Sequence, residues 1–178
     1  DHGIDEDELG VEIRSSQETV VIGKTELGMP IYIDAIADTA DFIIPVNRIK
    51  SHTEFSHSFE SGVIKMLAIG MGKEQGATTY HRYIINHGYP AVLGGVTKHI
   101  LASGKVLFGL GIVEDGNCET SQVEVLRPET MFEQEARLLE QSIDLSPKLP
   151  FDELDVLMID EMGKDISITA PTTPEAKH

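Results

Sequence analysis

Two strongly apolar runs constrain the fold of this chain more than any other feature. Residues 41–46 read DFIIPV and residues 105–113 read KVLFGLGIV, with glycine-studded segments of helical spacing between them. Apolar strands that alternate with helices are typical of βαβ units, in which helices cover both faces of a parallel sheet. The sequence therefore predicts the α/β class, with a Rossmann-like, mostly parallel sheet, flanking helices and part of a second α/β domain.

Shorter patterns predict the remaining elements. β-Branched runs separated by glycine and proline indicate hairpin strands, and apolar residues that recur on one side indicate helices. The elements predicted in this way are strands at 19–22, 30–33, 123–126 and 155–159 and helices at 33–40, 90–103 and 128–143. The first ten residues are acidic without an apolar period, so they are predicted to form a loop.

The chain is expected to contain two units. Residues 1–145 form a cofactor-binding α/β domain, which we expect to lack upstream residues. Residues 146–178 begin with the proline-containing linker SPKLP and continue as the start of a second domain or as a tail. The two apolar strands both fall in the first unit, so the chemistry is expected there.

Composition excludes several classes of partner. Fourteen basic residues against thirty acidic ones give a net charge of -16, which opposes binding to nucleic acid and to anionic membranes. Cys118 is the single cysteine, so an intrachain disulfide and a thiolate metal cluster are excluded. No apolar run approaches the roughly 18 residues that cross a bilayer. We expect a cytoplasmic protein with a small-molecule partner, and homo-oligomerisation is left open.

The stretch from residue 41 to residue 82 contains most of the residues suited to chemistry. Lys65 lies in the apolar segment 59–70, where low dielectric would depress its pKa and suit it to covalent attachment. The alternative is a lysine whose stem packs while its ammonium reaches water or pairs with Glu60 or Glu54.

Three histidines of this stretch are candidates for acid-base catalysis or for metal binding. His52, His57 and His81 have the right chemistry near neutral pH, but no tight spacing of the HxH or HExxH kind joins them. A lone histidine is more often a surface or structural residue. His87 and His99 fit that structural interpretation better.

Residues 70–76, GMGKEQG, look like a segment that brings backbone close to an anionic ligand, which makes Gly72 and Lys73 candidate cofactor-binding residues. The pattern matches neither the P-loop nor the dinucleotide fingerprint, and a helix end with a turn is the alternative.

Two cations follow the first apolar strand. Arg48 and Lys50 are suited to holding a carboxylate substrate, because strand ends in α/β folds carry ligand sites. Surface ion pairs with neighbouring acids are the alternative interpretation.

Several motifs together resemble a known family. Residues 47–55 (NRIKSHTEF), 60–66 (ESGVIKM) and 68–73 (AIGMGK) resemble the N-terminal domain of the nickel-dependent lactate racemase family. Residues 13–16 and 159–167 resemble the same relatives. The resemblance covers most of the chain, and its central motif is fairly specific.

This resemblance implies a cofactor and a reaction. The cofactor is a nickel pincer nucleotide, pyridinium-3,5-bisthiocarboxylic acid mononucleotide with nickel, attached covalently to the lysine that matches Lys65. The nickel-binding histidine matches His81, and the histidine that exchanges the substrate's hydroxyl proton matches His52. The implied function is racemisation or epimerisation of a 2-hydroxy acid or sugar acid by proton-coupled hydride transfer.

Two other functions are left open by the sequence. One is a cofactor-free binding or interaction domain that kept the fold without catalysis. The other is a phosphate- or nucleotide-using enzyme built on residues 70–76.

Overall fold

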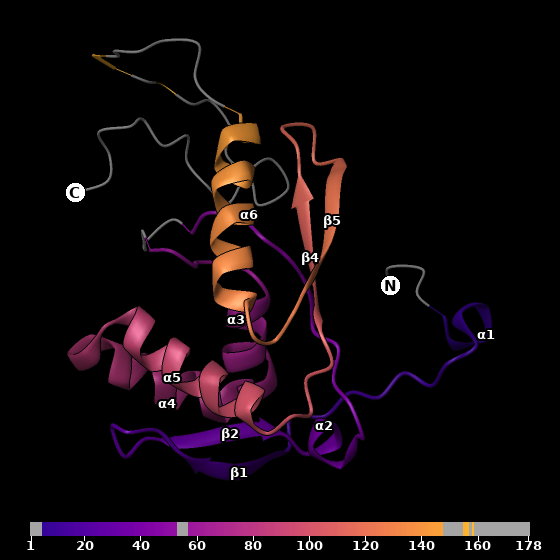
Figure 1. Cartoon of the computed structure of the whole chain (residues 1–178), viewed down its shortest axis with the longest axis vertical. Coiled ribbons are helices and arrows are strands. Elements are labelled where there is room, and N and C mark those ends of the chain that lie inside the picture. The colour runs from indigo at the N-terminus through magenta and orange to yellow at the C-terminus, as the bar shows by residue number, and fades with distance from the viewer. Residues whose placement is uncertain (1–4, 53–56, 148–154, 157, 159–178) are drawn as a thin grey trace.

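The structure is a computed structural model that describes residues 5–52, 57–147, 155–156 and 158. It contains a β-hairpin, a three-stranded sheet and helices around them (Figure 1). The elements are, in chain order, α1 (Glu6–Leu9), β1 (Thr19–Lys24), β2 (Pro30–Asp34), α2 (Ala35–Thr39), β3 (Val46–Arg48), α3 (Val63–Lys65), the π-helix η1 (Met66–Gly70), α4 (Met71–His87), α5 (Tyr89–Ala102), β4 (Gly109–Glu114), β5 (Thr120–Leu126) and α6 (Met131–Leu145).

The predicted hairpin is confirmed. Strands β1 and β2 pair antiparallel, with Thr19 opposite Asp34 and Lys24 opposite Pro30. Gly28 has a φ of 75° in the turn, a conformation that glycine adopts without steric cost. Its N–H donates to the Thr25 carbonyl at 2.9 Å, which closes the turn.

The second sheet has the strand order β3-β4-β5, and its pairing is mixed. Strands β3 and β4 are parallel, whereas β4 and β5 are antiparallel. The short connection after β4 explains the antiparallel pair, because a tight turn cannot return the chain to a parallel register. Asp115 organises that turn by accepting the N–H groups of Asn117 and Glu119 at 2.8 and 3.0 Å. The α/β class with flanking helices is confirmed, and half of this sheet's pairings are parallel.

Residues 41–46 do not form the strand buried on both faces that their apolar run predicts. The strand β3 begins at Val46, and upstream of it Ile43 makes an isolated bridge to Val106. Ile43 is buried, while Phe42, Ile44 and Val46 are 60%, 44% and 48% exposed. The alternation shows that one face of this segment packs on the core and the other faces outward.

The predicted helices at 90–103 and 128–143 are confirmed as α5 and α6. The helix predicted at 33–40 is the shorter α2, which begins after Asp34 because that side chain accepts the Ile36 N–H at 2.7 Å. The acidic start is not all loop, since Asp5 caps the short helix α1. The predicted strand at 155–159 lies partly outside the described residues.

Helix α3 continues into η1 and α4, so the glycine-rich segment 70–76 is helical rather than a loop. The helical path is interrupted at Lys73, which has φ 51° and ψ -157°. In Figure 1, α4 accordingly runs in a different direction from α3. In the described part of the chain, no helix is long and apolar enough to cross a membrane.

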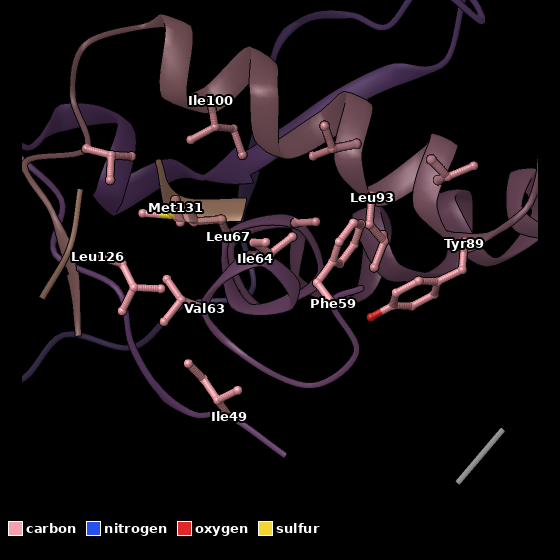
Figure 2. Packing of buried hydrophobic residues seen from close by; sticks show 14 of the residues in the cluster. Ile49, Phe59, Val63, Ile64, Leu67, Tyr89, Leu93, Ile100, Leu126 and Met131 are labelled. Atoms are coloured by element: carbon pink, nitrogen blue, oxygen red, sulfur yellow. The ribbon is translucent and has the colours of Figure 1, made fainter. Parts of the chain in front are cut away.

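The core lies where α3, α5, α6 and the sheet meet. Figure 2 shows Val63, Ile64 and Leu67 packed among side chains of the other elements, including Leu93 and Leu126. All five are fully buried. The helix that carries Lys65 therefore packs against α5 and α6 within this core.

Gly111 of β4 has no space for a side chain. An added Cβ would lie 2.6 Å from the Ile49 side chain and 2.8 Å from that of Leu126. We expect Gly111→Ala to lower the free energy of unfolding by about 1–3 kcal/mol, because the core must shift to relieve the contact. Chemical denaturation measures this change.

Val123→Thr provides the control for Gly111→Ala, since Val123 lies on the neighbouring strand β5 and is 57% exposed. Its effect should stay within about 0.5 kcal/mol. Equal denaturation midpoints for Gly111→Ala and the wild type would contradict the packing described for β4.

Candidate functional site

The backbone that leads to Lys65 is held by the loop after β3. Lys50 and Ser61 form an antiparallel bridge, with N–H to carbonyl distances of 2.9 and 3.2 Å. The Asn47 amide donates to the Gly62 carbonyl at 2.9 Å. The predicted site loop therefore lies directly against the start of α3, whose last residue is the half-buried Lys65.

Glu60 binds the backbone of two of the predicted histidines. Its side chain is 2% exposed and accepts the backbone N–H of His52 at 2.5 Å and that of His57 at 3.2 Å. The Tyr89 hydroxyl donates to the Glu60 carbonyl, and the Tyr89 ring stacks on His57 with centroids 5.9 Å apart. Because both carboxylate oxygens accept hydrogen bonds from N–H groups, the free-energy cost of burying this charge is offset.

A second buried carboxylate, that of Glu135 on α6, contacts the start of α3. It is 1% exposed and accepts the Ile64 N–H at 2.9 Å. Burial raises the pKa of Glu135 to about 7, although hydrogen bonds from the Ile64 and Val63 N–H groups oppose the rise. The sequence prediction missed this residue. Its signal was an acid on the buried side of α6, between Met131 and Leu138.

His81 lies on the exposed side of α4 with one ring nitrogen engaged. Its Nδ1 is 2.7 Å from the Ala77 carbonyl oxygen. Since a carbonyl can only accept, Nδ1 carries the hydrogen and the neutral ring keeps the lone pair on Nε2. Metal-binding histidines in proteins commonly have this arrangement.

No group of three or more His, Cys, Asp or Glu side chains in the described ranges is arranged to hold a metal ion.

Lys73 and Gly72 lie at the interruption between η1 and the body of α4. The Lys73 ammonium is 2.7 Å from the Asp34 carboxylate. Burial of the Asp34 carboxyl acts to raise its pKa. The Lys73 ammonium and two backbone N–H groups nevertheless hold the pKa of Asp34 below its usual value. Gly72 is buried beside Tyr80, where an added Cβ would lie 3.0 Å from the ring. These contacts give both residues structural roles, and cofactor binding by them stays a prediction.

Arg48 and Lys50 are exposed near the end of β3. Arg48 pairs with Glu114 of the neighbouring strand β4 at 3.1 Å, which is the surface ion pair that the sequence left as an alternative. A pair this exposed contributes little stability. Substrate binding by the two cations stays a prediction.

The structure thus brings Lys50 and His52 to the segment that precedes Lys65. His81 lies beyond the interruption at Lys73, and its convergence with Lys65 stays a prediction. His99 donates from Nε2 to the Ile22 carbonyl, 3.3 Å away, as expected for a structural histidine.

A cleft of about 800 Å³ lies elsewhere, between the hairpin turn, α5 and Phe132. It is lined by aromatic and small residues with Lys24 and Lys98 among them, and within the described chain its lining includes none of the predicted site residues. The cleft is therefore separate from the site proposed on α3 and α4.

These features describe an α/β domain built around a lysine-bearing helix that buried carboxylates hold in place. Residues 10–92 match the family model of the lactate racemase N-terminal domain. Over these residues the chain is similar to that domain, as the resemblance of its central motifs predicted.

The fold is similar to that of a solved structure. The lactate racemase apoprotein from Thermoanaerobacterium thermosaccharolyticum aligns with a TM-score of 0.53 and 19% sequence identity, over 70% of this chain. The chain spans 31% of that protein's length. A comparison with curated proteins gives no match.

The backbone of Lys73 provides a test of strain at the predicted cofactor-binding segment. Its φ and ψ fall in a region that is essentially restricted to glycine and costs other residues about 1–3 kcal/mol. Lys73→Gly and Lys73→Ala both remove the ion pair with Asp34. We expect the glycine variant to be the more stable by about that amount in urea denaturation.

The matched control is the neighbouring exposed residue Glu74, which lies in the same helix. There the alanine variant should be more stable than the glycine variant by about 1 kcal/mol, the usual helix preference. If alanine is also preferred at Lys73, the strain is absent.

Glu60→Gln tests the hold on the histidine segment. The amide keeps one acceptor oxygen, so one buried N–H of His52 or His57 loses its partner, at a cost of about 1–3 kcal/mol. We expect faster hydrogen exchange at one or both amides, measured by NMR. Glu140→Gln, at an exposed position on α6, should leave both amides unchanged. Unchanged exchange in Glu60→Gln would show that this carboxylate does not hold the segment.

Proposed function

We propose that this chain is the cofactor-bearing part of a racemase or epimerase that inverts C2 of a 2-hydroxy acid or sugar acid. The observation that carries the proposal is the match of residues 10–92, which include His52, Lys65 and His81, to the lactate racemase N-terminal domain. The state of His81 supports it, because an imidazole that keeps its Nε2 lone pair outward is suited to a metal.

The residues present fit a nickel pincer nucleotide. Lys65 provides a primary amine for the covalent link, on a helix whose start is fixed by buried hydrogen bonds. His81 would supply the protein's nitrogen ligand to nickel. Gly72 and Lys73 would approach the nucleotide part of the cofactor. The Lys73 ammonium pairs with Asp34, the last residue of the hairpin strand β2.

When bound, the cofactor supplies a site that accepts the C2 hydride of the substrate and returns it. His52 would take the hydroxyl proton as the carbonyl forms and give it back as the hydride returns to the other face. Glu60 holds the His52 backbone and thereby limits where the imidazole can lie. The proton that His52 would return to the substrate oxygen restores the alcohol.

The charge of the chain sets a requirement on substrate binding. With a net charge of -16 the protein repels anions in general, so a carboxylate substrate needs local cations. Arg48 and Lys50 would provide them beside the His52 loop. We also propose that the enzyme is cytoplasmic and that its substrate is a small molecule.

Intact mass spectrometry of the protein produced together with cofactor-synthesising enzymes tests the proposal. We expect a mass addition on Lys65 that Lys65→Arg abolishes, because the guanidinium does not form the thioacyl link. His81→Gln should keep the covalent addition but lower the nickel retained after dialysis by at least about tenfold, the loss typical even of an outer-shell partner.

His87→Gln is the matched control, since His87 is an exposed histidine at the end of the same helix. It should change neither mass nor nickel. An unmodified Lys65 under these conditions would contradict the proposal and would favour the cofactor-free binding domain instead.

A further inference from the structure

Helix α3 has no cap from its own sequence. Its N-cap residue is Gly62, and no side-chain hydrogen bond caps the helix locally. The first N–H groups of a helix lack partners within it, and buried N–H groups need an acceptor. Here the acceptor comes from another part of the chain, because Glu135 of α6 takes the Ile64 N–H at 2.9 Å.

Gly62 and Glu135 fit each other closely. A Cβ on Gly62 would lie 2.4 Å from Oε1 of Glu135, so the carboxyl occupies the space that a side chain would need. Among the described residues, Oε1 has no hydrogen-bond partner. One oxygen thus binds the helix start, while the other faces the Gly62 backbone with its polar capacity unused.

Ile64, the residue before Lys65, is held at both of its backbone groups. Its N–H donates to Glu135, and its carbonyl accepts the Thr97 hydroxyl of α5 at 3.2 Å. The Asn47 amide holds the Gly62 carbonyl. Of the three side chains that make these contacts, Glu135 alone can change charge.

We propose that Glu135 is a positioning residue for Lys65, whose ionised carboxylate holds the first turn of α3 and whose protonation weakens that hold. The inference rests on the proposed function in one respect, namely that Lys65 is the attachment point of the cofactor. The proton would come from solvent and return to it, without any covalent step.

Within the described residues, ionisable groups on α5, in the loop before α3 and on α3 lie on the elements around Glu135. Tyr89 of α5 faces Glu135. Burial raises the pKa of Tyr89 well above its usual range, and the negative charges of Glu135 and Glu60 raise it further, so the phenol stays protonated. Glu60 lies in the loop before α3 with both oxygens on N–H groups. Lys65 is the ionisable residue of α3 itself. Burial raises the pKa of Glu135 to about 7, so this carboxyl changes charge close to neutral pH.

The Ile64 amide reports on this hold directly and without cofactor. We expect its NMR shift and its hydrogen-exchange protection in the wild-type protein to titrate with a midpoint of about 7. Protection should fall about tenfold on protonation, the change expected when a charge-assisted hydrogen bond becomes a weaker neutral one. In Glu135→Gln, which keeps the size and one acceptor oxygen, both should be independent of pH.

The Lys65 amine provides the second readout. Its rate of acylation by an amine-reactive ester, followed by peptide mass spectrometry, should show an additional step near the same pH in the wild type. Lys98, exposed on α5, gives the pH dependence of an ordinary amine in the same sample. Glu135→Gln should remove the additional step at Lys65 and leave Lys98 unchanged.

The outcomes separate this inference from the proposed function. A wild-type Ile64 amide without a step near pH 7 would overturn the inference, and that measurement needs no variant to fold. Identical Lys65 acylation profiles in wild type and Glu135→Gln would also overturn it. A clear step in both readouts on a protein whose Lys65 never takes up cofactor would sustain the positioning role and reject the proposed function.

Discussion

The arrangement of the site depends on the burial of two carboxylates against the backbone that precedes Lys65. Glu60 and Glu135 are both almost fully buried, and each accepts N–H groups from the segment between His52 and Ile64. An ionised carboxylate in the interior costs several kcal/mol unless hydrogen bonds offset the loss of water. The cost restricts where the carboxylates can lie, so they fix the loop and the helix start together. Both oxygens of Glu60 accept N–H groups, whereas Oε1 of Glu135 has no hydrogen-bond partner among the described residues. Burial raises the pKa of Glu135.

The start of α3 and the loop before it contact both the core and the strand β3. Helix α3 contributes Val63 and Ile64 to the core, and the loop before it pairs with the end of β3 through Lys50 and Ser61. The residue proposed to carry the cofactor therefore follows two fully buried core residues, while its own side chain is half-buried. Rigid support below a reactive group limits the conformations it must lose on binding, which is how a protein scaffold positions chemistry.

The outward face of the second sheet contrasts with this packed side. Ile44 and Val46 are 44% and 48% exposed, and on β5 Val123 and Val125 are 57% and 49% exposed. Within the described residues, helices cover the opposite face, where α6 packs on β4. The chain spans 31% of the lactate racemase structure that shares its fold. An alternating strand pattern, rather than a continuous apolar run, is what one covered face produces.

Local patterns in the sequence were enough to determine the hairpin, α5 and α6, because turn residues and helical spacing act between neighbours in the chain. The motifs around His52, Lys65 and Gly72 likewise resemble the lactate racemase N-terminal domain, whose model matches residues 10–92. The tertiary structure alone decided that β5 pairs antiparallel with β4, that residues 41–46 expose one face, and that Lys73 interrupts a helix. It also decided the role of Glu135, which meets Ile64 across 71 residues of chain. Contacts of that kind depend on which surfaces pack together, and a pattern within one segment does not encode them.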